Sequence, residues 1–388
     1  MSMIYLNQAA TTYPKPQCVL DAHTASLYQM PESQFRSETS SPAESIFDRC
    51  RHNIGKLLGI SETDRVFFSS GATDSANAVI YGLHLKGKKV VATQTEHNSI
   101  LRPLMNLRDQ VGEVVIAPCD RRGIVDPKTV DQAITEDTAA VFVNHCSNVT
   151  GAVQDLEALG KVAAKHNVLF VVDASQSAGC IPLDVDKWGI DVLIFTGHKS
   201  LFGVQGTGGY YVRKGVPFRP YRFGGTGRDS RKIIYNGDDY EYEPGTQNGP
   251  GIAALNAGIS YILDRTVDRI AQKEQELMGK LYNGLKEIHN AEVYGSPETN
   301  KGPVLSFNIR GLLPTDAAYI LQNGYDIVVR TGLQCAPLIH NSLGTAEHGT
   351  VRISISDLTE EEEIDILLNA IREIASSVED EYETDRQD

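Results

Sequence analysis

Short apolar runs alternate with helical stretches between residues 64 and 213, and this alternation constrains the fold more than any other feature. The runs are apolar at consecutive positions, which is typical of strands that are covered on both faces. Right-handed crossovers between such strands produce a mostly parallel sheet. The expected strands are 66–68, 90–93, 114–117, 140–143, 168–172 and 192–195, and the expected helices are 74–85, 99–110, 126–136 and 156–165. The sequence therefore predicts an α/β fold with helices on both faces of a mostly parallel central sheet.

The remainder of the chain predicts a second, smaller unit. Residues 224–251 are rich in Gly, Asp and Tyr with little periodicity, which indicates a long functional loop region. An amphipathic helix follows, and the last helix opens with the capping-box residues Thr359 and Glu362. Between these helices the pattern indicates a small C-terminal α+β domain. We expect a large domain over 16–258 and a small domain formed by 1–15 and 259–388.

The charge and the cysteine usage exclude several classes of protein. A formal net charge of −14 argues against nucleic acid as a partner, because phosphate binding requires clustered Lys and Arg. The six cysteines form no CxxC pair, so we expect reduced thiols and no metal site or disulfide framework. Since there is no long apolar run and no basic-then-apolar leader, we expect a cytoplasmic protein without a membrane segment.

Polar motifs follow several of the predicted strands, at the sheet edge where ligands gather. Ser69-Ser-Gly-Ala-Thr73 has the form of a phosphate cradle at a helix start, although small residues also make ordinary turns. Asp173 ends an apolar strand, where a protonated pyridine nitrogen would pair with it; the alternative is a helix cap. Lys199 follows another strand and has the setting of a desolvated Schiff-base lysine, with a surface lysine as the alternative.

Two further polar residues have weaker signals. His97 is expected to stack on a flat ring or to be a hydrogen-bonded structural histidine. Asn148 is expected to donate to a ligand or to form an Asx turn before Gly151.

The C-terminal third contains a candidate thiol and a candidate anion site. Cys335 lies in Gly332-Leu-Gln-Cys-Ala-Pro337, a loop bounded by Gly and Pro, and the positive charge of Arg330 would favour its thiolate. Arg352 lies in an alternating strand that could present its guanidinium to a carboxylate, with a surface ion pair as the alternative. The other cysteines are expected to be small buried hydrophobes: Cys18, Cys50, Cys119, Cys146 and Cys180.

Eight motifs in a fixed order carry a resemblance to a known family: SSGAT, EHN, SNVTG, VDASQS, TGHKS, EPGTQN, VRTGLQCAP and GTVRIS. Together they resemble the cysteine desulfurases of the class V aminotransferase group, which are fold-type I enzymes dependent on pyridoxal 5′-phosphate (PLP). The similarity extends from Leu6 to the last helix. The compact segment from Arg330 to Ala336 resembles the short-loop branch of this family. The resemblance implies a PLP-dependent transferase-like fold.

The resemblance also implies roles for individual residues. Lys199 would bind PLP covalently, Asp173 would pair with the pyridine nitrogen, and Gln176 would contact the ring hydroxyl. Thr246 would reach the phosphate of the partner subunit, which implies a homodimer. The implied cofactor-binding residues are Ala72, Thr73, His97, Asp173, Gln176, Thr196, His198, Lys199 and Thr246. The implied substrate-binding residues are Asn148, Arg352 and Ala10, and the implied catalytic residues are Lys199, Cys335 and His97.

The activity that the resemblance implies is conversion of L-cysteine to L-alanine, with a persulfide left on Cys335 for a sulfur-acceptor protein. One alternative is a PLP-dependent selenocysteine lyase or another class V aminotransferase or C–S lyase. A second alternative, from another class, is a non-catalytic partner or scaffold; the presence of Lys199, Asp173, His97 and Cys335 disfavours it. The chain departs from the family pattern near the expected mouth of the site, at Asn7, Gln8, Glu38, Thr39, Leu333 and Gln334.

Overall fold

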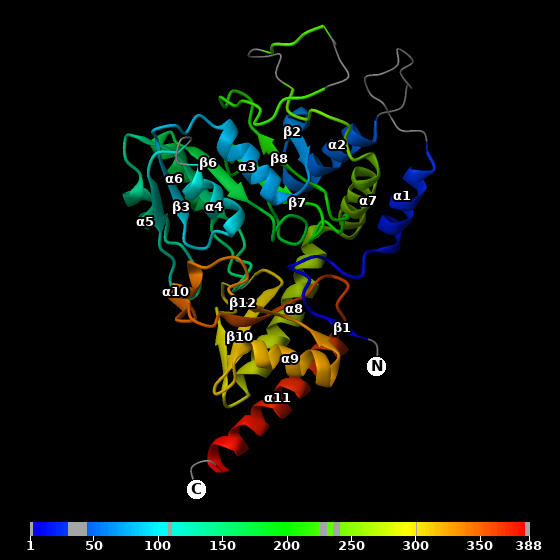
Figure 1. The fold of residues 1–388 in the computed structure, drawn as a ribbon, viewed down its shortest axis with the longest axis vertical. Coiled ribbons are helices and arrows are strands. Elements are labelled where there is room, and N and C mark those ends of the chain that lie inside the picture. Colours follow the sequence, from blue (N-terminus) through cyan, green and yellow to red (C-terminus); the bar gives the residue numbers. More distant parts are fainter. Residues whose placement is uncertain are drawn as a thin grey trace.

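The chain folds into a large and a small layered unit, with the small unit below the large one in Figure 1. The computed structural model describes residues 3–29, 45–107, 111–225, 231–235, 241–299 and 301–384. In this described part of the chain, every helix is too short or too polar to span a lipid bilayer.

A seven-stranded sheet forms the centre of the large unit. Its strands are β2 (Val66–Ser69), β3 (Lys89–Thr93), β4 (Val114–Ala117), β5 (Thr138–Asn144), β6 (Leu169–Asp173), β7 (Val192–Thr196) and β8 (Gly208–Val212). They lie in the order β2-β8-β7-β6-β5-β3-β4. Only β8 is antiparallel to its neighbours, β2 and β7. The prediction of a mostly parallel sheet is therefore confirmed, and β8 is a strand that the apolar runs did not predict.

Helices cover both faces of this sheet, as the consecutive apolar positions predicted. They are α1 (Gln17–Leu27), α2 (Ile46–Leu58), α3 (Ala72–Gly82), α4 (Asn98–Asn106), α5 (Pro127–Ala133), α6 (Leu156–His166) and α7 (Gly249–Arg265), with a short 3-10 helix at Thr63–Arg65. Within β6, Phe170 and Val172 pack in the core beneath α2, α6 and α7, whereas Val171 packs in the core beneath α3 and α4. Each central strand thus buries both of its faces.

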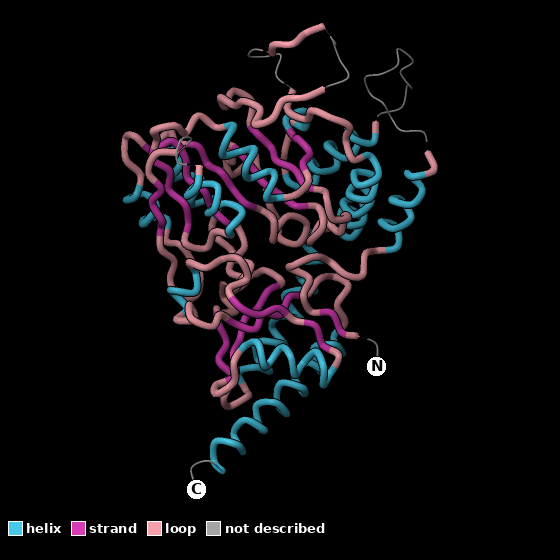
Figure 2. The backbone as a smooth tube through the Cα atoms, viewed as in Figure 1, coloured by secondary structure: helices cyan, strands magenta, loops and turns pink. Residues whose placement is uncertain are grey.

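The small unit combines a four-stranded antiparallel sheet, in the order β12-β13-β10-β9, with a two-stranded parallel pair, β1 and β11. The strands are β1 (Ile4–Tyr5), β9 (Ala291–Tyr294), β10 (Val304–Ile309), β11 (Ile327–Val328), β12 (Arg330–Gly332) and β13 (Thr350–Ser354). The helices are α8 (Val267–Lys286), α9 (Pro314–Tyr325), α10 (Ile339–Leu343) and α11 (Glu361–Thr384). Figure 2 shows α11 on the outer side of these strands. The expected C-terminal α+β unit is present.

Helix α8 belongs to both units, because its first turns pack in the core of the large unit and its later turns pack in the core of the small unit. Ile270 packs in the core of the large unit, whereas Leu277 packs with Ile4 and Leu6 in the core of the small unit. The N-terminal segment therefore packs with the C-terminal third, as we expected. The division into 16–258 and 1–15 with 259–388 stays a prediction. Helix α7 extends to Arg265, and its Ile262 packs in the core of the large unit.

Three local expectations were wrong. The helix expected to begin at Asp74 begins at Ala72, because Gly71 already serves as its N-cap. Thr359 does not cap α11: its hydroxyl accepts a hydrogen bond from the Ser356 N–H, and the Glu360 N–H donates to Glu363 instead. Cys18 is exposed, because α1 turns only Val19 of its residues into the core.

Candidate active site

A cavity of about 430 Å³ lies where the carboxyl ends of the parallel strands face the small unit. Residues after β2, β3, β5, β6 and β7 line one side, and the segments around β12 and β13 line the other. It contains all but one of the predicted site residues: Ala10, Ala72, Thr73, His97, Asn148, Asp173, Gln176, Thr196, His198, Lys199, Cys335 and Arg352. The exception, Thr246, is exposed and does not line this cavity.

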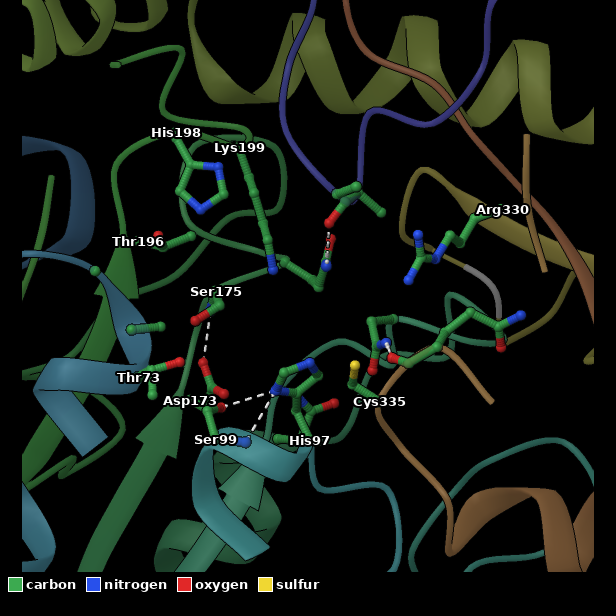
Figure 3. A pocket seen from close by; sticks show the side chains of 18 of the residues that line it. Thr73, His97, Ser99, Asp173, Ser175, Thr196, His198, Lys199, Arg330 and Cys335 are labelled. Carbon is green, nitrogen blue, oxygen red and sulfur yellow. Dashed lines mark hydrogen bonds between the residues drawn. The ribbon is translucent and has the colours of Figure 1, made fainter. Parts of the chain in front are cut away.

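Lys199 extends into the cavity from the segment that follows β7, and Figure 3 shows its amine directed toward the centre of the site. Its backbone is held by the N-terminal segment: the Thr12 hydroxyl donates to the Lys199 carbonyl at 2.7 Å. The Thr12 N–H and the Thr11 hydroxyl donate to the neighbouring His198 carbonyl at 3.0 and 3.1 Å. Burial lowers the pKa of Lys199 to about 8, although the charge of Asp173 opposes this shift. The structure therefore holds a lysine that is readily deprotonated.

Asp173 is the last residue of β6 and is only 3% exposed. Its Oδ1 accepts a hydrogen bond from the Ser175 N–H at 2.8 Å. Burial raises the pKa of this carboxyl, while the Ser175 hydrogen bonds and the charge of Lys199 oppose the rise. A buried carboxylate at this position requires a cationic partner in the cavity.

His97 presents a neutral ring to the cavity. It caps α4, and its Nδ1 accepts a hydrogen bond from the Ser99 N–H at 3.0 Å. A nitrogen that accepts carries no proton, so the ring proton lies on Nε2. Burial, together with the charges of Lys199 and Arg352, lowers the pKa of His97 to about 3. His97 therefore stays uncharged at neutral pH and can stack on a flat ligand.

The start of α3 provides a site for an anion. Gly71 has a φ of 144°, and no side chain caps the helix, so the first backbone N–H groups remain available. Gly208 on β8 approaches so closely that a Cβ there would lie 2.6 Å from the Gly71 Cα. His198 adds a buried Nδ1 that has no hydrogen-bond partner among the described residues. Thr73 and Thr196 also line the cavity: Thr73 is in the first turn of α3, and Oγ1 of Thr196 lies 3.8 Å from the place of a Cβ built on Gly71.

Arg352 provides a second site for an anion, on the side of the small unit. Its guanidinium donates to the Asn148 carbonyl at 3.1 Å and to Oδ1 of Asn7 at 2.9 Å. Its Nε is buried without a partner, and Arg352 forms no ion pair with any described carboxylate. Burial and the charge of Arg330 lower its pKa to about 10, so the group stays charged at neutral pH. A carboxylate ligand would neutralise this charge.

Cys335 lies across the cavity from Lys199 in the view of Figure 3, in the loop that follows β12. It is exposed, in contrast to four buried cysteines: Cys50, Cys119, Cys146 and Cys180. Its carbonyl accepts a hydrogen bond from the Asn98 N–H at 2.7 Å, which ties the loop to the start of α4. The predicted thiol therefore lies in the same cavity as the predicted lysine.

Glu96 is a residue of this region that the sequence analysis did not single out. It is fully buried, and its Oε1 accepts a hydrogen bond from the Thr93 hydroxyl at 2.6 Å. Burial, with a further contribution from the charge of Asp173, raises its pKa to about 8. Glu96 is therefore protonated at neutral pH. Its position directly before His97 in the motif EHN was the available signal.

The residues that depart from the family pattern lie in different places. Asn7 contacts Arg352, as described above, and the side-chain amide of Gln8 exchanges hydrogen bonds with the backbone of Tyr13 at 2.7 and 2.9 Å. Gln334 lines the cavity. Glu38 and Thr39 lie outside the described residues.

The residues of the cavity fit PLP. The buried, unpartnered Nδ1 of His198 and the uncapped start of α3 line the same cavity and suit a phosphate, and Asp173 suits a protonated pyridine nitrogen. Between them, Lys199 offers an amine whose lowered pKa suits a covalent bond to an aldehyde.

Comparison with known proteins identifies the family of the chain. The family model described as aminotransferase class-V matches residues 4–367. A "Probable cysteine desulfurase" from Methanothermobacter thermautotrophicus is 34% identical over 96% of this chain and 94% of its own. "Cysteine desulfurase IscS" from Dictyoglomus turgidum is 27% identical over 96% and 94%. The solved apo structure of a cysteine desulfurase from Thermococcus onnurineus NA1 has a TM-score of 0.84 and 30% identity, and covers 97% of this chain and 95% of its own.

The chain therefore belongs to the class-V aminotransferase family, and within it to the cysteine desulfurase group. The resemblance and the fold that the sequence motifs predicted are confirmed.

Proposed function

We propose that this protein is a PLP-dependent cysteine desulfurase that converts L-cysteine to L-alanine and transfers the sulfur to Cys335. One observation carries the proposal: a lysine of lowered pKa and an exposed thiol line opposite sides of one cavity, with a charged guanidinium between the two units. The relatives named as cysteine desulfurases support the same reaction.

Each residue has a physical role in this proposal. Arg352 binds the carboxylate of the amino acid and so orients its α-carbon toward Lys199. When bound, PLP supplies an electron sink that makes the α-proton acidic. Lys199, whose amine loses its proton near pH 8, takes this proton as the base. The neutral ring of His97 stacks on the cofactor without adding charge.

Cys335 accepts the sulfur. Its thiolate attacks the substrate sulfur, so that a sulfur–sulfur bond forms as the substrate's carbon–sulfur bond breaks. The electron pair of the broken bond stays on the carbon, which takes up a proton and ends as the methyl group of alanine. Cys335 then carries a persulfide. Since this residue is exposed, we propose that a sulfur-acceptor protein or a thiol takes the sulfur there.

The activity is tested by incubating the enzyme with L-cysteine and a reductant, and measuring alanine and sulfide together. The proposal predicts equal amounts of the two products and the loss of both in Cys335→Ser. Cys18→Ser is the matched control, because Cys18 is the other exposed thiol and does not line the cavity. Pyruvate and ammonia in place of alanine would contradict the proposal. A Cys335→Ser variant that still releases sulfur would show that this thiol is not the acceptor.

We also propose that the active form is a homodimer in the cytoplasm. Thr246 is exposed and does not line the cavity of its own chain, which is expected if it serves the phosphate site of a partner subunit. Large apolar side chains are exposed nearby in sequence and on α1, including Ile233, Ile234 and Leu27. Light scattering tests the assembly: a monomeric holoenzyme with full activity would contradict it.

A further inference from the structure

The loop that holds Cys335 has an unusual backbone. Gly332, Gln334 and Cys335 have φ values of 87°, 42° and 60°, so two consecutive residues with side chains adopt the left-handed region. Side chains disfavour this region, and it persists only where surrounding contacts hold it. The loop therefore depends on contacts that keep Cys335 in this conformation.

The side chain of Gln334 supplies such a contact. It is 5% exposed, and its Nε2 donates to the Thr350 carbonyl at 2.8 Å. The Thr350 hydroxyl donates in return to Oε1 of Gln334 at 3.4 Å. Thr350 begins β13, the strand that also carries Arg352. Gln334 thus ties the loop to the strand that presents the carboxylate-binding guanidinium.

Backbone carbonyls of the same loop are held from the large unit. Nδ2 of Asn148 donates to the Gln334 carbonyl at 2.7 Å, and the Asn98 N–H donates to the Cys335 carbonyl at 2.7 Å. Farther along, Nε2 of Gln94 donates to the Leu338 carbonyl at 2.8 Å. The large unit therefore binds the backbone carbonyls of the loop, whereas β13 binds the side chain of Gln334.

We propose that Gln334 is a positioning residue for sulfur transfer, which fixes the Cys335 thiol at the distance and direction that attack on the substrate sulfur requires. This inference rests on the proposed function, because it assigns Gln334 to the step in which Cys335 accepts sulfur. Gln334 acts through the backbone of Cys335. Binding of the amino acid, which depends on Arg352 and Lys199, does not require it.

The experiment compares substitutions of Gln334 in the holoenzyme with L-cysteine as substrate. Gln334→Leu keeps the size of the side chain but removes both hydrogen bonds to Thr350. We expect its kcat to fall about tenfold to a hundredfold with KM within about twofold, since misplacement of a reacting group by about 1 Å has effects of this size. Gln334→His, which retains an N–H donor, should recover most of the lost kcat. Gln322→Leu, at an exposed position of α9, is the matched control.

A second readout does not depend on catalysis. Iodoacetamide modification of Cys335, followed by mass spectrometry of its peptide, should change in rate several-fold in Gln334→Leu and return toward the original rate in Gln334→His. Gln334→Gly separates the side-chain contact from the backbone conformation, because glycine adopts a left-handed backbone without strain. We expect Gln334→Gly to lose kcat as Gln334→Leu does. It also decides the outcome if the leucine variant does not fold.

Three results would overturn the inference: an unchanged kcat in Gln334→Leu, a KM that rises in proportion to the fall in kcat, or full activity in Gln334→Gly. Failure of the proposed function has a different signature. In that case Cys335→Ser would remain active, whatever the behaviour of the Gln334 variants.

Discussion

We expect the amine of Lys199 to lose its proton near pH 8 in the protein without cofactor, because burial lowers its pKa from 10.5. The difference corresponds to about 3 kcal/mol of preference for the neutral amine. At about pH 7.5, roughly a quarter of the Lys199 amines would be neutral, compared with about one in a thousand for an exposed lysine. Burial thus prepares this lysine to react with an aldehyde.

The charges around Lys199 determine the direction in which two substitutions should shift the pKa of its amine. Asp173 raises the pKa of Lys199, so Asp173→Asn should move the titration below pH 8. Arg352 lowers the same pKa, so Arg352→Gln should move it upward. Between about pH 8 and 10.5 the unfolded chain binds a proton that folded Lys199 lacks, so the free energy of unfolding should rise with pH across this window.

The assay mixes cofactor-free protein with PLP and follows the absorbance change of the bound cofactor at a series of pH values. The rate should level off above about pH 8, and Lys199→Ala should abolish the signal. Lys15→Arg is a needed control, because burial also lowers the pKa of Lys15 to about 8 and its amine donates to the His198 carbonyl. A rate that keeps rising to pH 10.5, or that Asp173→Asn does not shift, would refute the reasoning.

Two other predictions concern Glu96 and Arg352. The folded state raises the pKa of Glu96 from 4.5 to about 8, so between these pH values folded Glu96 binds a proton that the unfolded chain lacks. The free energy of unfolding should therefore be highest, with respect to this group, below pH 4.5 and should fall as pH rises to 8. Glu96→Gln should flatten this part of the pH dependence in denaturant unfolding, and an unchanged slope would contradict the assignment. Arg352→Lys should raise the KM for cysteine about tenfold to a hundredfold, because it loses the fork of charge-assisted hydrogen bonds. Steady-state kinetics with an unchanged KM would show that the carboxylate binds elsewhere.

The sequence predicted the elements and residues whose signals are local. Consecutive apolar positions located the parallel strands, and the polar residues after them, such as Asp173 and Lys199, do line one cavity. The antiparallel strand β8 was not predicted because it starts with two glycines, Gly208 and Gly209, rather than with apolar side chains. A Cβ at these positions would collide with Gly71 and with the ring of Phe195.

Contacts between distant segments could not be predicted from the pattern. The hydroxyl groups of Thr11 and Thr12 donate to the backbone carbonyls of His198 and Lys199, each 187 residues farther along the chain. Gln334 appeared only as a departure from the family pattern, and its contact with Thr350 depends on the pairing of β12 with β13. Such contacts follow from the folded arrangement rather than from the spacing of residue types.

The covalent site of the cofactor is the most direct test of the whole account. Borohydride reduction of the holoenzyme, followed by digestion and mass spectrometry, should place the reduced cofactor on the peptide that contains Lys199 and on no other. A cofactor found on another lysine, such as Lys15, would contradict the account.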